Sequence, residues 1–212
     1  MTVIAVTGVG LVCPAGVGHA AAAARLAAGA LTAVPPAGAE GEAMPTPPVL
    51  RVPDDFDPRA WLTRRKDLKL MARANQLAVA AGRLALADAG LTDADLRDGG
   101  LFLGVGREPG NLDDVLPAVA HSIADGALDL DRLVDAGVQW MNPLSSLKTL
   151  PNMSVAHLSI NLGLMGPSQA LCAGPAAGAF ALAEGVRAVL EGRAPFALAG
   201  AADSRVDFAA RV

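Results

Sequence analysis

The sequence predicts an α/β protein with α-β-α layers around a mostly parallel central sheet. Short apolar runs typical of buried strands alternate with longer stretches in which apolar residues recur at helical spacing. Enough chain separates these runs to form the crossover helices that parallel pairing requires. The 212 residues are 52% hydrophobic and 18% charged, so we expect one domain over residues 1–212 with a sizeable core.

The N-terminal elements are expected to be a strand, a helix and a long loop. Val3–Thr7 is a β-branched apolar run before a glycine, which predicts a buried strand, and Leu11–Cys13 is a candidate continuation. Ala20–Ala28 is rich in alanine and is followed by Gly29, a residue that commonly ends helices. Residues 35–58 contain seven prolines and predict an extended surface loop.

The rest of the chain alternates between helices and strands. Apolar residues of the segment 70–85 share one helical face, and Gly90 is expected to end that helix. Asn152 follows Pro151 and is placed to cap a further helix. The strands expected here are Leu101–Val105, Ser168–Cys172 and Phe196–Ala201. The later helices are expected near 112–124, over 152–162 and over 175–190.

Composition excludes several function classes. A formal net charge of −4, an aromatic content of 3% and the absence of tyrosine argue against nucleic-acid binding. Two cysteines make no disulfide framework, and we see neither a signal peptide nor an apolar run long enough to span a membrane. We therefore expect a cytoplasmic protein that binds neither nucleic acid nor membrane.

The segment after Ser168–Cys172 is the most informative part of the chain. A short strand that turns sharply into a helix can present a nucleophile at the helix N-terminus, where the helix dipole favours a thiolate or an oxyanion. At the turn, where such a site would hold cysteine or serine, this chain has Pro175. Proline suits the first turn of a helix but has no nucleophilic atom and no N–H donor. The scaffold of a reactive site is therefore predicted without its reactive group.

Other candidate groups favour a structural interpretation. Neither glycine pair, after Thr7 or at Gly104, has the spacing of a dinucleotide loop, and the three histidines lack metal-ligand spacing, so we expect no cofactor and no metal. His157 is expected in the core or at an interface. Arg64, Arg65, Lys66 and Lys69 form a basic cluster, expected to be a solvated face, with docking of an acidic carrier domain as the alternative. Cys172 is expected to be a buried, inert thiol.

Five segments together resemble the N-terminal half of a β-ketoacyl synthase, a condensing enzyme with the thiolase fold. The resemblance runs in order over nearly the whole chain. It is carried by Val6–Gly16, by Leu70–Leu91, by Asn142–Pro143 with Leu150–Met153, by Gly163–Ser168 and by Ala199–Ser204.

This resemblance implies a catalytically deficient subunit, or pseudoenzyme, because the family's catalytic cysteine falls at Pro175. The family's two catalytic histidines and a supporting lysine lie in a second half, which we expect this protein to lack. By analogy with chain-length factors, the expected partner is a full-length ketosynthase in polyketide or fatty-acyl biosynthesis, with acyl carrier protein nearby. A homodimer and a complementary ketosynthase half are the alternative partners.

The resemblance also indicates which residues line an acyl pocket or a subunit interface. The strand before the nucleophile position is expected to pair across a dimer axis, with the helix from Ala176 packed behind it. The residues concerned are Asn152, Met153, His157, Met165, Ser168, Gln169, Ala170, Leu171, Cys172 and Phe180. Three alternatives stay open: one half of a split acyltransferase, a thioester enzyme that uses Cys172 as a displaced nucleophile, and a decayed fragment.

Overall fold

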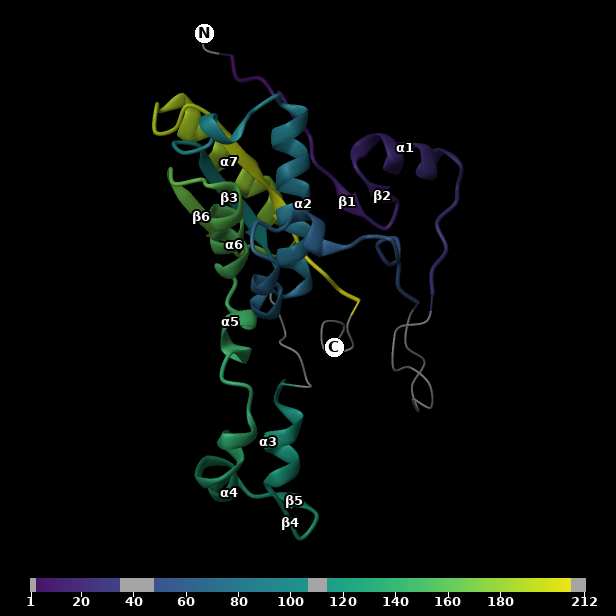
Figure 1. Cartoon of the computed structure of the whole chain (residues 1–212), viewed down its shortest axis with the longest axis vertical. Coiled ribbons are helices and arrows are strands. Elements are labelled where there is room, and N and C mark those ends of the chain that lie inside the picture. The colour runs from purple at the N-terminus through teal and green to yellow at the C-terminus, as the bar shows by residue number, and fades with distance from the viewer. Residues whose placement is uncertain (1–2, 35–47, 107–113, 207–212) are drawn as a thin grey trace.

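A computed structural model describes residues 3–34, 48–106 and 114–206, and its centre is a three-stranded parallel sheet (Figure 1). The strand order is β6 (Ser168–Leu171), β3 (Gly100–Val105), β7 (Ala197–Ala202). Leu101 lies opposite Ser168 on one side of β3 and opposite Leu198 on the other. The predicted fold class and all three of these strands are confirmed, although β3 begins one residue earlier than predicted, β6 ends one residue earlier and β7 is shifted by one residue toward the C-terminus.

Helices cover both faces of this sheet, which completes the predicted α-β-α layers. Leu101, Leu103 and Val105 of β3 pack in one core with α2 (Arg73–Asp88) and α6 (Met153–Leu162). Phe102 points the other way and packs against α7 (Ala177–Leu190). Because side chains alternate across a strand, an uninterrupted apolar sequence in β3 supplies both cores.

Close packing of α7 on the sheet depends on glycine. A Cβ added to Gly104 would overlap backbone atoms of Ala177 and Gly178. One added to Gly185 would stand 2.8 Å from the Ala199 Cβ atom. The small residues therefore allow the helix backbone to rest almost directly on β3 and β7.

The expected strand Val3–Thr7 is wrong. This segment makes no strand pairing within the described residues, and Val3 and Val6 are 78% and 83% exposed. It runs beside α2, where Cβ atoms at Gly8 and Gly10 would overlap the helix backbone. The first pairing is a short antiparallel hairpin, β1 (Val12–Cys13) with β2 (Gly16–Val17), followed by α1 (His19–Ala27).

Short 3₁₀ helices precede the first core helix. They are η1 (Pro58–Trp61) and η2 (Arg65–Leu70), so α2 begins at Arg73 and not at Leu70. A further 3₁₀ turn, η3 (Asp93–Asp95), precedes β3. Of the proline-rich segment, residues 35–47 lie outside the described part; residues 48–57 form no helix, and Val49 makes one bridge to Val34.

A polar seam joins α2, α6 and the loop after η1. The Arg83 guanidinium donates to the carbonyl oxygens of Trp61 (2.6 Å) and Asn161 (2.7 Å) and to Thr63 Oγ1 (2.8 Å). Asn161 Oδ1 accepts from the Thr63 N–H at 3.0 Å. Deeper in the same interface, the buried Ser154 hydroxyl donates to Asn75 Oδ1 at 2.6 Å.

Residues 114–149 form an arm that projects from the body (Figure 1). Its elements are α3 (Leu116–His121), β4 (Ile123–Ala124), β5 (Ala127–Leu128), α4 (Leu130–Asp135), η5 (Gly137–Trp140) and α5 (Ser145–Thr149). The helix expected near 112–124 therefore ends at His121, where a hairpin begins, while 112–113 lie outside the described residues. At the arm's base Lys148 Nζ and Asn142 Nδ2 each donate to the Asp114 carboxylate at 2.7 Å. The pKa of Asp114 is lowered, mainly by Lys148.

No helix in the described ranges is long and apolar enough to cross a membrane. Both cysteines are free thiols.

Candidate functional site

The predicted strand-turn-helix is present at the junction of β6 and α7. Strand β6 ends at Leu171, one residue before the predicted end. Gly174 has a φ of +55°, a left-handed conformation that glycine adopts at little cost. A single 3₁₀ turn, η6 (Gly174–Ala176), then leads into α7, so the α-helix begins at Ala177 and not at position 175.

Pro175 stands in that 3₁₀ turn, on the exposed side of the junction. Residues 172–176 are all exposed, and the first buried residue of the helix is Ala177. The N-terminus of the helix is therefore exposed to solvent at this junction. Of the residues in the turn, only Cys172 carries a reactive side chain.

The expected burial of Cys172 is wrong, because the residue is exposed. It lies beyond the end of β6, and β6 is an edge strand, so neither the sheet nor a helix covers it. Cys172 does not line the two cavities described below. Its thiol thus projects to the surface beside the turn.

The histidines do not form a catalytic or metal group. His157 is buried, and its Nε2 lies 3.3 Å from the Leu70 carbonyl oxygen, which places it in the core. Burial lowers its pKa below the usual 6.5, against the opposing effects of Leu70 and Asp67. His121 is exposed and stacks on Trp140 with ring centroids 3.8 Å apart. Within the described ranges no three ligand-type side chains gather as a metal site.

The residues assigned to an acyl pocket or an interface are not gathered around one cavity. Met165 and Phe180 are 69% and 54% exposed. Ser168 and Gln169 lie exposed on the edge strand β6, while Ala170, Leu171 and Met153 are half-buried. Asn152 occupies the N-cap position of α6, but its side chain makes no capping hydrogen bond.

A cavity that the sequence did not predict lies between the N-terminal segment and the sheet. Its volume is about 610 Å³, and its walls are residues 3–10, α2, the outer edge of β7 and part of α7. Thr7 is its one polar side chain among the lining residues. This cavity lies where the Val3–Thr7 segment runs beside β7 without pairing to it. A second cavity, of about 570 Å³, lies near Cys13, Arg73 and Asp203.

The outer face of α7 is an exposed apolar surface. Four large side chains of α7 are between 42% and 54% exposed: Phe180, Leu182, Val186 and Leu190, of which Leu182 and Val186 also line the first cavity. Soluble monomers seldom leave so many large apolar groups uncovered on one helix. The outer edge of β6, which pairs with no strand among the described residues, adds to the character of an association surface.

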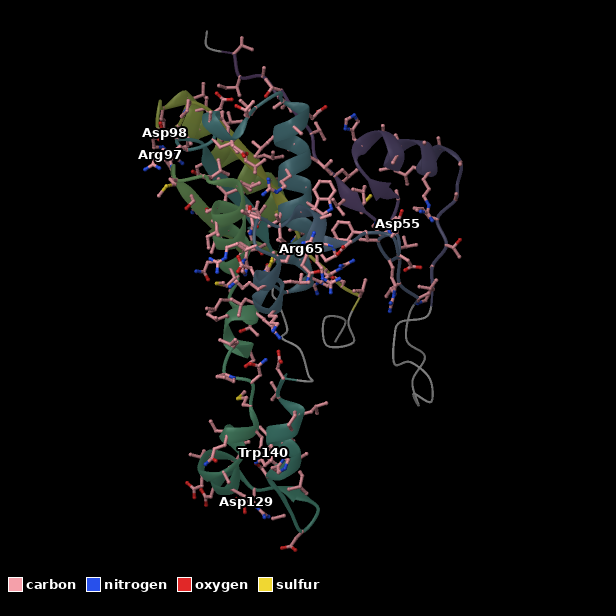
Figure 2. All side chains as sticks on the ribbon, in the orientation of Figure 1. Asp55, Arg65, Arg97, Asp98, Asp129 and Trp140 are labelled. Atoms are coloured by element: carbon pink, nitrogen blue, oxygen red, sulfur yellow. The ribbon has the colours of Figure 1, made fainter. Side chains whose placement is uncertain are left out.

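The basic cluster lies on η2 and the residue before it, and Figure 2 labels Arg65 within it. All four cationic side chains are exposed, as the solvated-face interpretation predicted. Arg64 pairs with Asp67 at 3.5 Å.

Comparisons with known proteins agree on one family. Residues 1–210 match the model described as β-ketoacyl synthase, N-terminal domain. The chain is 30% identical over 149 residues to 3-oxoacyl-[acyl-carrier-protein] synthase 2 of Vibrio harveyi, covering 70% of this chain and 33% of that protein.

Solved structures show the same fold. The ishigamide ketosynthase/chain length factor superposes with a TM-score of 0.71 and 27% identity, over 94% of this chain and 47% of that one. A β-ketoacyl synthase from Burkholderia phymatum, at 23% identity and a TM-score of 0.68 over 92% of this chain and 45% of that one, supports the fold alone. The chain thus spans about a third of the curated relative and about half of these structures.

Proposed function

Because this chain belongs to the β-ketoacyl synthase family, we propose that it is a catalytically deficient subunit that associates with a partner ketosynthase in polyketide or fatty-acyl biosynthesis. The observation that carries the proposal is Pro175 at the turn before α7. Covalent acyl transfer needs a nucleophile. We infer from the family resemblance that Pro175, with its saturated ring, stands where the family has this nucleophile.

Exposed apolar surface supports the association. The outer face of α7 and the free edge of β6 adjoin the turn, and both would be stabilised by a covering subunit. One related structure is titled as a ketosynthase/chain length factor, and another as an acyl-carrier protein in complex with its ketosynthase. The partner proposed here is a ketosynthase, with acyl carrier protein nearby.

Native mass spectrometry after co-expression with a full-length ketosynthase tests the association. We expect a stable mixed assembly. Phe180→Glu with Val186→Glu should abolish it, since charge would enter the contact face, whereas Leu26→Glu on the exposed side of α1 is the control. A wild-type chain that stays separate, or a mixed assembly that survives both α7 substitutions, contradicts the proposal.

The exposure of Cys172 favours a second candidate, a thioester enzyme that uses this thiol alone or with a complementary half. Intact-protein mass after incubation with acyl thioesters separates the two. The pseudoenzyme proposal expects no stable acyl adduct on the wild type and a new adduct on Pro175→Cys. An adduct on the wild type that disappears in Cys172→Ala would establish the enzyme and overturn the proposal.

A further inference from the structure

The second cavity lies where four parts of the chain meet. Its walls come from the hairpin of β1 and β2, from the loop 50–56, from the first turns of α2 and from residues 203–206, which follow the carboxyl end of β7. Its volume of about 570 Å³ is within the range of cavities that hold small organic ligands. None of the residues 172–176 lines it, so this cavity is separate from the turn on which the proposed function rests.

Positive charge is in excess on the lining. Three arginines, Arg51, Arg73 and Arg205, face two aspartates, Asp54 and Asp203, which gives a formal net charge of +1. The Asp203 carboxylate accepts from Arg205 Nε at 3.0 Å and from the N–H of the next residue at 2.9 Å. Because Arg205 and Asp203 neutralise each other, two guanidinium groups remain against the single carboxylate of Asp54.

Arg73 is held in the wall by defined contacts. It is the first residue of α2 and is half-buried. Its guanidinium carbon lies 5.1 Å from the centre of the ring of Phe56, a buried residue, and its Nη1 donates to Gln76 Oε1 at 3.1 Å. A guanidinium has five N–H donors, so these contacts can orient it while it also donates to an occupant of the cavity. The first turn of α2 has no acidic residue, which adds the positive end of the helix dipole.

Apolar side chains form much of the remaining wall. Leu50, Phe56 and Leu77 are among the largest of them. Such a wall favours the organic part of a ligand, while arginine binds a carboxylate through two parallel N–H···O bonds. The lining therefore combines a surface for an apolar group with donors for an anion.

We propose that this cavity binds a small organic acid, a single carboxylate carried on an apolar group. Arg51 and Arg73 bind the carboxylate, and the apolar group lies against Phe56 and Leu77. The net lining charge of +1 matches one negative charge, and the carboxylates already on the wall oppose a second. Binding at this site needs no partner subunit, so it stands apart from the proposed function.

Isothermal titration calorimetry on the full chain tests the proposal with two carboxylate probes, benzoate and hexanoate. We expect saturable one-site binding of a carboxylate and binding of benzamide that is weaker by about tenfold or more, since the amide lacks the charge. Arg51→Met and Arg73→Met should each weaken carboxylate binding by about tenfold. Arg59→Met is the control, because Arg59 is exposed and does not line this cavity.

The two cysteines provide a second measurement that needs no substitution. Cys13 is half-buried and lines the cavity, whereas Cys172 is exposed and does not line it. Bound carboxylate should slow alkylation of Cys13 by iodoacetamide and leave that of Cys172 unchanged, as followed by peptide mass spectrometry.

Four results would overturn the proposal. They are a failure of both carboxylates to bind, equal affinity for benzoate and benzamide, alkylation of Cys13 that saturating carboxylate does not slow, and tighter binding of phenyl phosphate than of benzoate. Circular dichroism of the arginine variants checks that each keeps the fold.

Discussion

The body and the arm use apolar residues in opposite ways. All six residues of β3 are buried, and three helices pack on its two faces. In the arm, small residues fill the few buried positions and the large apolar side chains face solvent. The body is therefore held by its own core. The Asp114–Lys148 pair joins the two ends of the arm to each other, and α5 contacts η2 and α6 of the body. The described residues of the arm therefore contribute little to the core that stabilises the body.

The largest expected effect comes from breaking the close contact inside the body. Gly104→Ala places a methyl group against the backbone of α7, where no side chain can move aside. We expect it to lower the free energy of unfolding by about 2–3 kcal/mol in urea denaturation. Gly200→Ala is the matched control, because a Cβ there meets no atom within 4 Å. Equal losses for both would refute tight α7 packing.

The polar seam of the body should give the next largest effect. Arg83→Lys keeps the charge but cannot reproduce a guanidinium that bonds to three oxygens. We expect a loss of about 1–2 kcal/mol in unfolding free energy. Arg187→Lys on the exposed side of α7 should leave the unfolding midpoint unchanged. An equal loss of unfolding free energy in Arg187→Lys would contradict a specific stabilising role for the Arg83 hydrogen bonds.

A pH titration of stability probes the same core. The pKa of His157 is lowered in the folded state, so the unfolded chain binds the proton more readily. The free energy of unfolding should therefore be fully retained above pH 6.5 and decline as the pH falls below it. His157→Gln should flatten this slope between about pH 7.5 and 5.5. An identical slope in the variant would contradict burial of a neutral imidazole.

The arm should respond least in global stability. Trp140→Ala removes the stack with His121 and should leave the urea midpoint close to that of the wild type. Amide hydrogen exchange should nevertheless accelerate in residues 116–140, since the arm opens without unfolding the body. A large shift of the global midpoint would show that the arm is part of the cooperative core.

The body was predictable because its signals are local. Strand β3 has an uninterrupted apolar run, α2 has an apolar helical face, and glycines with positive φ follow α1 and α2 at Gly29 and Gly90. Such patterns depend on neighbours along the chain. The strand-turn-helix junction at Pro175 belongs to the same class and was predicted from residue order alone.

The errors concern positions that depend on sheet order. Val3–Thr7 has the composition of a strand but lies unpaired beside β7, and Cys172 is exposed because β6 is an edge strand. Residue composition does not reveal which strand forms an edge. The arm hairpin did have a local sequence signal, the Asp125–Gly126 dipeptide, which favours a two-residue hairpin turn. Both residues have positive φ in the structure, as that turn requires.

The central place of β3 has a consequence for how the chain folds. Leu101 of β3 pairs with Ser168 of β6, and Gly100 of β3 pairs with Ala197 of β7. Both partner strands are therefore synthesised long after β3. Parallel pairings of such long range close slowly, and until then an uninterrupted apolar strand is open to other chains. We therefore expect slow refolding and a need for chaperones during synthesis, whatever the final stability of the protein.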